Sequence, residues 1–138
     1  MTVGLVVVSH SRALADAAVE LARQMLPGRE LAVEIAAGME DGSLGTDAVA
    51  VSEAITAADS GEGVVVLMDL GSAVLSAETA LELLTDDVRE RVTLSAAPLV
   101  EGLVGAVVVA AGGASRERVE AEAARGLAPK QVHLGLVP

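Results

Sequence analysis

His10 stands where a run of apolar residues gives way to a helical pattern. Residues 3–8 read as a strand buried on both faces, and apolar residues recur at helical spacing over residues 14–25. A neutral imidazole is nucleophilic at physiological pH, and backbone N–H groups at the start of a helix bind anions. His10 could therefore accept a phosphoryl group. From its position alone, it could equally be a histidine that only fills or caps the start of the helix.

Asp69 occupies the equivalent place after another apolar run, residues 64–68. A carboxylate that accepts a hydrogen bond from one ring nitrogen fixes the tautomer and makes the other nitrogen the nucleophile. Gly71 and Ser72 follow; Gly71 allows close backbone approach, and Ser72 offers a hydroxyl and an N–H to an anion. The alternative is that Asp69 caps the turn and that Ser72 is an ordinary N-cap of the helix beginning there.

A third loop, residues 38–45, is rich in glycine and acidic residues. It could form a lid or a surface for a partner, and a plain surface loop is the alternative. Its Glu40 and Asp41 argue against direct contact with phosphate. We expect Thr46 to cap the helix that follows, with Asp47 in its first turn.

The elements that must position these loops alternate along the chain. Strands are expected at four apolar runs: residues 3–8, 33–37, 64–68 and 92–96. Pro98 and the glycines after residue 111 favour a helix over residues 98–111, although its three consecutive valines would pass as a strand. A polar helix is expected over residues 115–125. The alternation of apolar residues in the tail, at Val132, Leu134 and Leu136, predicts a short final strand.

This alternation of strands and helices predicts an α/β fold, a three-layer flavodoxin-like sandwich with four parallel strands in the order 2-1-3-4. That order places the first strand beside the third. Ligands of such sheets bind beyond the carboxyl ends of the strands, at the switch in strand order, so the loops of His10 and Asp69 should meet there. The 138 residues, 1–138, fit a single domain.

Composition excludes several classes of function. There is no Phe, Tyr or Trp to stack on bases, and the net charge of −11 repels nucleic-acid phosphates, so no nucleic-acid partner is expected. The acidic surface suits docking onto a protein with a basic face. There is no cysteine and no run of about 20 apolar residues, so we expect a cytoplasmic protein without a membrane segment. The helix over residues 98–111 is apolar nearly all round, and a second subunit is the simplest cover for it.

No metal or cofactor is expected. No cluster of His, Cys or carboxylates has ligand spacing, and His133 has no such neighbour and is interpreted as a surface residue. The sequence contains neither a P-loop nor G-x-G-x-x-G, so nothing supports nucleotide binding by this chain.

Four stretches carry a resemblance to a known family: GLVVVSHS at residues 4–11, AGMEDGSLGT at 37–46, VLMDLGSA at 66–73 and APLVEG at 97–102. Together they resemble the mannose-type enzyme IIA domains of the bacterial phosphoenolpyruvate phosphotransferase system (PTS). Within that superfamily the chain is more similar to the phosphotransferase subunit of PEP-dependent dihydroxyacetone kinases. The similarity extends over nearly the whole chain up to Gly113.

The resemblance implies that His10 is phosphorylated by the general PTS phosphocarrier protein and that Asp69 pairs with it. The phosphate-binding groups would be Ser11 at the helix start, Gly71 and Ser72. The loop that contributes Gly38, Met39 and Thr46 would lie near the site.

The resemblance also implies a homodimer and, as in mannose-type relatives, an antiparallel final strand. The phosphoryl group would pass to ADP on the nucleotide-binding subunit of the kinase. Two departures from the family stand out: Met39 replaces one of a pair of glycines, and Ser76 replaces an Asn. Two other functions remain open, an enzyme IIA component of a mannose-type sugar transporter and a non-catalytic regulatory module of the same fold.

Overall fold

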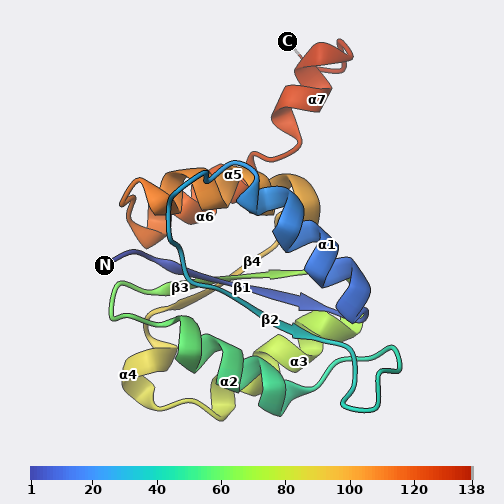
Figure 1. Cartoon of the computed structure of the whole chain (residues 1–138), viewed down its shortest axis with the longest axis vertical. Helices are drawn as coiled ribbons and strands as arrows, with labels where there is room; N and C mark the ends of the chain where they lie inside the picture. Colours follow the sequence, from blue (N-terminus) through green and yellow to red (C-terminus); the bar gives the residue numbers. More distant parts are fainter. Residues whose placement is uncertain (138) are drawn as a thin grey trace.

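The structure, a computed structural model, describes residues 1–137. It contains one sheet of four parallel strands in the order β2-β1-β3-β4, as predicted (Figure 1). The strands are β1 (Gly4–Ser9), β2 (Val33–Ala37), β3 (Val64–Met68) and β4 (Val92–Ser95). The helices are α1 (Arg12–Arg23), α2 (Ala48–Ala58), α3 (Gly71–Glu82), α4 (Asp86–Arg89), α5 (Leu99–Ala111), α6 (Arg116–Ala124) and α7 (Ala128–His133).

Two aliphatic cores sandwich the sheet. Helices α1, α5 and α6 cover one face, and α2, α3 and α4 cover the other (Figure 1). Successive residues of a strand point to opposite faces, so Leu5 and Val7 enter the first core while Val6 and Val8 enter the second. All four are fully buried, and each such side chain contributes roughly 1.5–3 kcal/mol by leaving water. This double burial explains why β1 is a continuous apolar run rather than an alternating one.

The central strands align their carboxyl ends. Val8 of β1 pairs with Met68 of β3, and the pairing continues one step further because the Asp69 N–H donates to the Val8 carbonyl at 3.1 Å. On the other side of β1, Ser9 pairs with Ala37 of β2. The register therefore brings the residues after Ser9 beside those after Met68.

The three helices near this edge begin differently. Ser11 caps α1, as its hydroxyl accepts from the Leu14 N–H at 3.2 Å. The prediction that Thr46 caps α2 is wrong, because Asp47 is the N-cap and accepts from the second and third N–H groups beyond it. The prediction that Ser72 caps α3 is also wrong. Leu70 precedes the helix without a side-chain cap, and Ser72 is its second residue.

A helix forms here as expected, α5 over Leu99–Ala111, and α6 covers part of its outer side, while Val100 and Val108 stay exposed. Helix α6 packs along α5 at two glycines, and at Gly102 there is no room for a larger side chain. A Cβ on Gly102 would lie 3.1 Å from the Ala123 carbonyl oxygen, and one on Gly105 would lie 3.4 Å from Cγ of Glu122. The chain thus covers α5 only in part, and the homodimer stays a prediction.

The predicted final strand, antiparallel or otherwise, is wrong: the alternating residues lie in and after helix α7. Pro129 is compatible with the first turn of a helix, where an N–H has no intrahelical acceptor. The chain then turns at Gly135, with a φ of +71°. Since α7 projects from the body (Figure 1), it meets no sheet edge with which a strand could pair.

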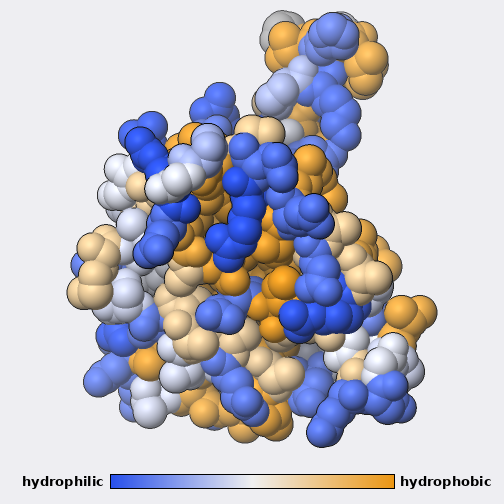
Figure 2. Space-filling model, in the orientation of Figure 1, coloured by the Kyte–Doolittle hydropathy of each residue, from blue (hydrophilic) through white to orange (hydrophobic). Residues whose placement is uncertain are grey.

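The apolar side chains of this segment remain in solvent, where hydrophobic and hydrophilic surface alternate (Figure 2). One polar contact ties the segment back to α5, between Lys130 Nζ and Glu101 Oε2 at 2.5 Å. None of the helices within residues 1–137 combines the length and the apolar character needed to cross a membrane.

Candidate active site

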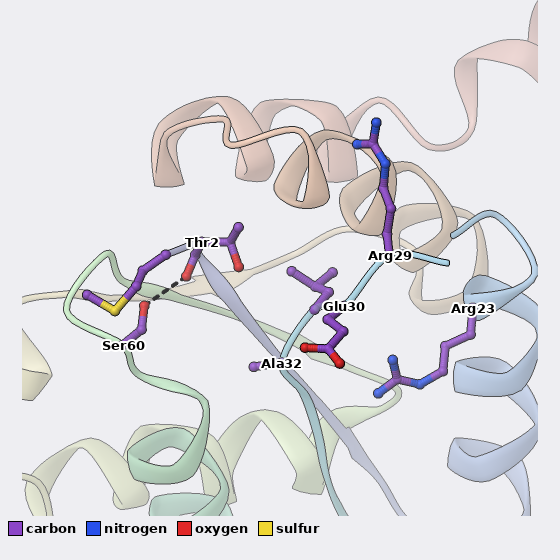
Figure 3. A pocket seen from close by; sticks show the side chains of 8 residues that line it. Thr2, Arg23, Arg29, Glu30, Ala32 and Ser60 are labelled. Atoms are coloured by element: carbon purple, nitrogen blue, oxygen red, sulfur yellow. Dashed lines mark hydrogen bonds between the residues drawn. The ribbon is translucent and has the colours of Figure 1, made fainter. Parts of the chain in front are cut away.

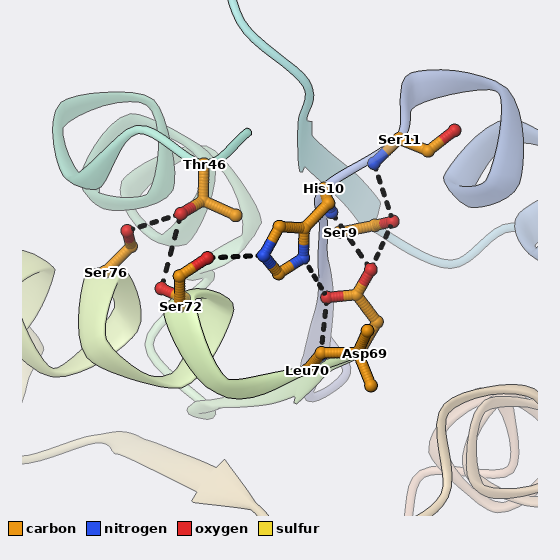
Figure 4. A network of polar contacts seen from close by, with 8 residues as sticks. All are labelled: Ser9, His10, Ser11, Thr46, Asp69, Leu70, Ser72 and Ser76. Carbon is orange, nitrogen blue, oxygen red and sulfur yellow. Dashed lines mark hydrogen bonds and ion pairs between the residues drawn. The ribbon is translucent and has the colours of Figure 1, made fainter. Parts of the chain in front are cut away.

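The imidazole of His10 lies at the carboxyl edge of the sheet, between the end of β1 and the start of α1. Its side chain is 29% exposed, whereas that of Asp69 is 10% exposed. The two ring nitrogens face different neighbours: Nδ1 faces Asp69 and Nε2 faces Ser72 (Figure 4). The two loops singled out in the sequence therefore meet at this ring.

Asp69 is held by donors on both carboxylate oxygens. Oδ1 is 2.8 Å from His10 Nδ1 and accepts from the Leu70 N–H at 2.6 Å. Oδ2 accepts from the Ser9 hydroxyl at 2.8 Å and from the His10 backbone N–H at 3.0 Å. Burial raises the pKa of Asp69, but these hydrogen bonds outweigh burial and bring the pKa below its usual value. The carboxylate is therefore ionised at neutral pH.

This contact determines which nitrogen can react. An ionised carboxylate only accepts hydrogen bonds, so Nδ1 must carry the proton that it donates to Asp69. In a neutral imidazole the lone pair then belongs to Nε2. The arrangement orients a nucleophilic nitrogen away from the sheet, and Asp69 stabilises positive charge that develops on the ring during attack.

Three hydroxyls lie on the Nε2 side of the ring (Figure 4). The Ser72 hydroxyl contacts Nε2 directly. Thr46 Oγ1 is 3.2 Å from the Ser72 carbonyl oxygen and 2.7 Å from Ser76 Oγ. These contacts join the loop before α2 to the first turn of α3.

The start of α3 offers free donors beside Nε2. The Ala73 N–H donates to the Leu70 carbonyl, but within residues 1–137 the N–H groups of Gly71 and Ser72 donate to no protein acceptor. A Cβ on Gly71 would meet nothing within 4 Å, so this turn is open to solvent. Unpaired N–H groups at the positive end of a helix bind anions. An anionic group on Nε2 would meet these donors.

Ser11, predicted to bind phosphate, is engaged elsewhere. Its N–H donates to Ser9 Oγ at 3.1 Å, and its hydroxyl accepts from the Leu14 N–H. Figure 4 shows its side chain directed away from the imidazole. In this structure Ser11 caps α1, and only Gly71 and Ser72 of the predicted phosphate-binding residues lie on the Nε2 side.

The loop with Gly38 and Met39 is anchored to the end of β1. The Gly38 N–H donates to the Ser9 carbonyl at 3.1 Å, and the Gly45 N–H donates to the His10 carbonyl at 2.9 Å. Gly38 has a φ of +69°, whereas Met39, like every other non-glycine residue described, does not have a positive φ. Met39 therefore needs none of glycine's conformational freedom, and its side chain packs against Gly45.

Sequence analysis missed Ser9 and Ser76 as site residues. Ser9 is fully buried and connects Asp69 to the Ser11 N–H. Its position directly before His10, on a strand buried on both faces, is a signal that could have found it. Ser76 lies four residues after Ser72 and so on the same side of α3, which is the spacing that could have identified it.

The His10 side chain is partly exposed and lines neither of two hollows in the surface. A hollow of about 400 Å³ lies beside Asp69 and the ends of β3 and β4, but His10 and Ser72 do not line it. Another hollow, of about 510 Å³, lies near the chain start and includes Arg23 and Arg29 (Figure 3). Within the described residues no group of three His, Cys, Asp or Glu side chains could hold a metal ion.

Comparisons with known proteins identify the family of this chain. The family model EIIA-man, described as the PTS system fructose IIA component, matches residues 4–120. The phosphoryl donor subunit DhaM of the PEP-dependent dihydroxyacetone kinase of Escherichia coli K12 is 50% identical over 136 residues. These cover 97% of this chain but only 29% of that protein. The DhaM of dihydroxyacetone kinase 2 from Listeria innocua is 37% identical over 117 residues, 85% of this chain and 93% of that protein.

A solved structure shares the fold at comparable identity. The crystal structure of EF1359, a protein of unknown function, superposes with a TM-score of 0.80 and is 36% identical. The match covers 90% of this chain and 94% of that one. The match of the family model over most of the chain, together with the Listeria relative, shows that the chain belongs to the EIIA-man family of phosphotransferase-system IIA components and, within it, is DhaM-like.

Proposed function

We propose that this chain is a phosphohistidine carrier that receives a phosphoryl group on Nε2 of His10 and passes it to a partner. The observation that carries the proposal is the hydrogen bond from Nδ1 to Asp69, which leaves the lone pair on Nε2 at an open face. The N–H groups of Gly71 and Ser72 are unpaired within residues 1–137 and begin the helix whose Ser72 hydroxyl contacts Nε2, which supports a role for them in binding the phosphoryl oxygens. We also propose that residues 1–138 form one enzyme IIA domain.

The transfer of the phosphoryl group from the donor to His10 needs no cofactor. The Nε2 lone pair forms a bond to phosphorus while the phosphorus–nitrogen bond of a donor phosphohistidine breaks, and the donor nitrogen takes back the electron pair. The Nδ1 proton stays in place, so the phosphorylated ring is cationic and is stabilised by Asp69. Catalysis consists of positioning and of charge stabilisation by preorganised donors. The reverse step, with a different acceptor, discharges the carrier.

We propose that the donor is the PTS phosphocarrier protein and that the acceptor is ADP on the nucleotide-binding subunit of a dihydroxyacetone kinase. The printed names of the relatives, phosphoryl donor subunits of PEP-dependent dihydroxyacetone kinases, support this assignment. The chain spans about 29% of the length of the Escherichia coli relative. Of the activities of that longer protein, we therefore propose for this chain only the phosphoryl transfer through His10.

A second candidate keeps the same chemistry but changes the acceptor. The family model describes the fructose IIA component of the PTS, which favours a sugar transporter as the alternative destination. Two acceptor assays separate these candidates: phosphorylation of ADP on soluble kinase subunits, and phosphorylation of a sugar by a membrane complex.

The test of the carrier role is the intact mass after incubation with phosphoenolpyruvate, enzyme I and the phosphocarrier protein. We expect wild type to gain one acid-labile phosphate and His10→Ala to gain none. His133→Ala is a matched control, because His133 is the other histidine of the chain and lies exposed in α7. It should gain the phosphate as wild type does. Phosphate on His10→Ala, or none on wild type with any cognate donor shown to be active, would contradict the proposal.

A further inference from the structure

We infer that Thr46 and Ser76 are positioning residues for phosphoryl transfer, because their hydroxyls hold the first turn of α3, and with it Ser72, in front of His10 Nε2. We call this pair of hydroxyls the Thr46–Ser76 clasp. The inference rests on the carrier function proposed above. The hydroxyls of Thr46 and Ser76 do not contact the imidazole, so both residues would act on transfer through Ser72.

The direction of the hydrogen bonds follows from counting protons. Thr46 Oγ1 has one proton and two neighbours, the Ser72 carbonyl oxygen at 3.2 Å and Ser76 Oγ at 2.7 Å. A carbonyl oxygen can only accept, so the Thr46 proton goes to Ser72. Ser76 must then donate its own proton to Thr46. The clasp is thus a directed chain from Ser76 to Thr46 to the Ser72 peptide group.

The clasp joins two segments that otherwise have separate anchors. The loop before α2 is fixed to the end of β1, because Gly38 and Gly45 donate to the carbonyls of Ser9 and His10. The start of α3 has no side-chain cap, and its first turn is exposed at Gly71 and Ser72. Thr46 is half-buried and connects the two. It therefore ties the free N–H groups of α3 to the backbone of the residue that carries the nucleophile.

This division of contacts leaves the Ser72 side chain free to move while its backbone is held. The Ser72 hydroxyl contacts only Nε2 within residues 1–137, whereas the Ser72 carbonyl is held by Thr46. When Nε2 accepts phosphorus, the hydroxyl must leave the lone pair, and it can rotate to donate to a phosphoryl oxygen. The N–H groups of Gly71 and Ser72 must stay fixed while the hydroxyl rotates, because the groups of a catalytic site must be held within about 0.5 Å of their productive positions. The clasp supplies that constraint.

Thr46→Val and Ser76→Ala each remove one hydroxyl of the clasp, and single-turnover phosphorylation by the phosphocarrier protein measures the result. We expect the rate constant at saturating donor to fall by about tenfold in each variant, as is typical when a supporting residue is lost. The donor concentration for half-maximal rate should not change, because both residues are half-buried and their hydroxyls are engaged with each other and with the Ser72 carbonyl. Thr46→Ser keeps the hydroxyl and should restore the rate.

Thr56→Val is the matched control, since Thr56 Oγ1 donates to the Ser52 carbonyl at 3.0 Å in the exposed part of α2, away from the site. It should transfer phosphate at the wild-type rate. The contact of the Ser72 hydroxyl with Nε2 reports the positioning independently: the ¹⁵N shift of unphosphorylated Nε2 should move in Thr46→Val and not in Thr56→Val.

Unchanged rates in both clasp variants would overturn the inference. A loss of rate in Thr46→Val that Thr46→Ser does not restore would also overturn it. So would variants in which only the affinity for the donor protein changes. A melting temperature lowered without a change in rate also overturns it, because a purely structural contact would behave that way. Failure of wild type itself to accept phosphate would instead contradict the carrier function.

Discussion

The two sides of the His10 imidazole are built differently. On the Nδ1 side, a carboxylate that is 10% exposed accepts four hydrogen bonds, from the Ser9 hydroxyl, two backbone N–H groups and the ring itself. On the Nε2 side, the nearest group is one exposed serine hydroxyl, and the N–H groups behind it have no acceptor within residues 1–137. One side is saturated and the other is open.

The difference shows how a carrier can be both selective in its chemistry and accessible to two partners. A satisfied, part-buried network has one arrangement, so the Nδ1 side can fix the tautomer and the ring orientation permanently. The Nε2 side must exchange a serine contact for a phosphoryl group and then release it. Weak, replaceable contacts suit that side, because a phosphate held too well would not pass on.

The largest effect should come from breaking the saturated side with Asp69→Asn. Oδ2 faces the Ser9 hydroxyl and the His10 N–H, whereas Oδ1 faces the Leu70 N–H and a ring nitrogen that can give up its proton. The amide nitrogen would therefore take the Oδ1 position and donate to Nδ1. The ring would then keep its lone pair on Nδ1 and carry the proton on Nε2, the wrong tautomer for attack. We expect single-turnover transfer to fall by about 10²- to 10⁴-fold.

Asp16→Asn is the control for this variant, since Asp16 is an exposed carboxylate of α1 paired with Arg12. Its transfer rate should match that of wild type. An Asp69→Asn variant that transfers normally would show that Asp69 is only a structural cap at the end of β3.

Ser9→Ala should have the next largest effect, and it acts on stability as well as rate. The substitution removes one donor to Asp69 and leaves the Ser11 N–H without its acceptor in a part-buried position. Loss of such a partner costs about 1–3 kcal/mol in the free energy of unfolding. We expect transfer to slow by about tenfold. Urea unfolding measures the loss of stability, provided that the dependence of the unfolding free energy on urea concentration is unchanged. Single-turnover phosphorylation measures the loss of rate.

A normal rate in a destabilised Ser9→Ala would separate the two roles and show that the remaining three donors orient Asp69 sufficiently. Ser60→Ala is the control, because the Ser60 hydroxyl bonds the Thr2 carbonyl at the other end of the sheet.

Local pattern was enough to predict the fold and the meeting of His10 with Asp69. The apolar runs at β1 and β3 could only be strands buried on both faces, and parallel wiring aligns their carboxyl ends. The strands themselves were predicted from residues adjacent in sequence, and the flavodoxin-like strand order then placed β1 beside β3. The same reasoning predicted a helix over residues 98–111 from the proline before it and the glycines after it.

Contacts made by small hydroxyl groups could not be predicted in this way. Thr46 and Asp47 are both good N-caps, and only the approach of α3 to the loop shows that Asp47 caps while Thr46 turns to Ser72. The tail failed for a different reason. Alternating apolar residues predict a strand only where a sheet edge is available, and α7 projects away from any edge.

On the open side, Ser72→Ala should have a smaller effect than either change on the saturated side. The variant loses one rotatable donor to the phosphoryl group, while the backbone N–H groups at positions 71 and 72 remain. We expect transfer to slow by less than about tenfold, which is a smaller effect than the removal of a fixed hydrogen-bond donor from an oxyanion hole has. The free energy of unfolding should stay within about 0.5 kcal/mol of wild type, since Ser72 is exposed. A loss as large as that of Asp69→Asn would show that the two sides are equally critical.

The smallest effect should be on the free energy of unfolding, through the pH dependence of the stabilisation that the Asp69 carboxylate provides. Hydrogen bonds lower its pKa in the folded protein in spite of burial, so the unfolded chain binds a proton at a higher pH than the folded one. The carboxylate therefore stabilises the fold fully above the unfolded pKa of about 3.9, and this contribution is lost as pH falls through the lower folded value. The difference in unfolding free energy between wild type and Asp69→Asn should shrink as the pH falls from about 5 to below about 4. Urea unfolding of both proteins across that range measures it. A difference that grows on acidification would mean that the folded protein prefers the protonated carboxyl, and the saturated side would then lack the charge on which the tautomer of His10 depends.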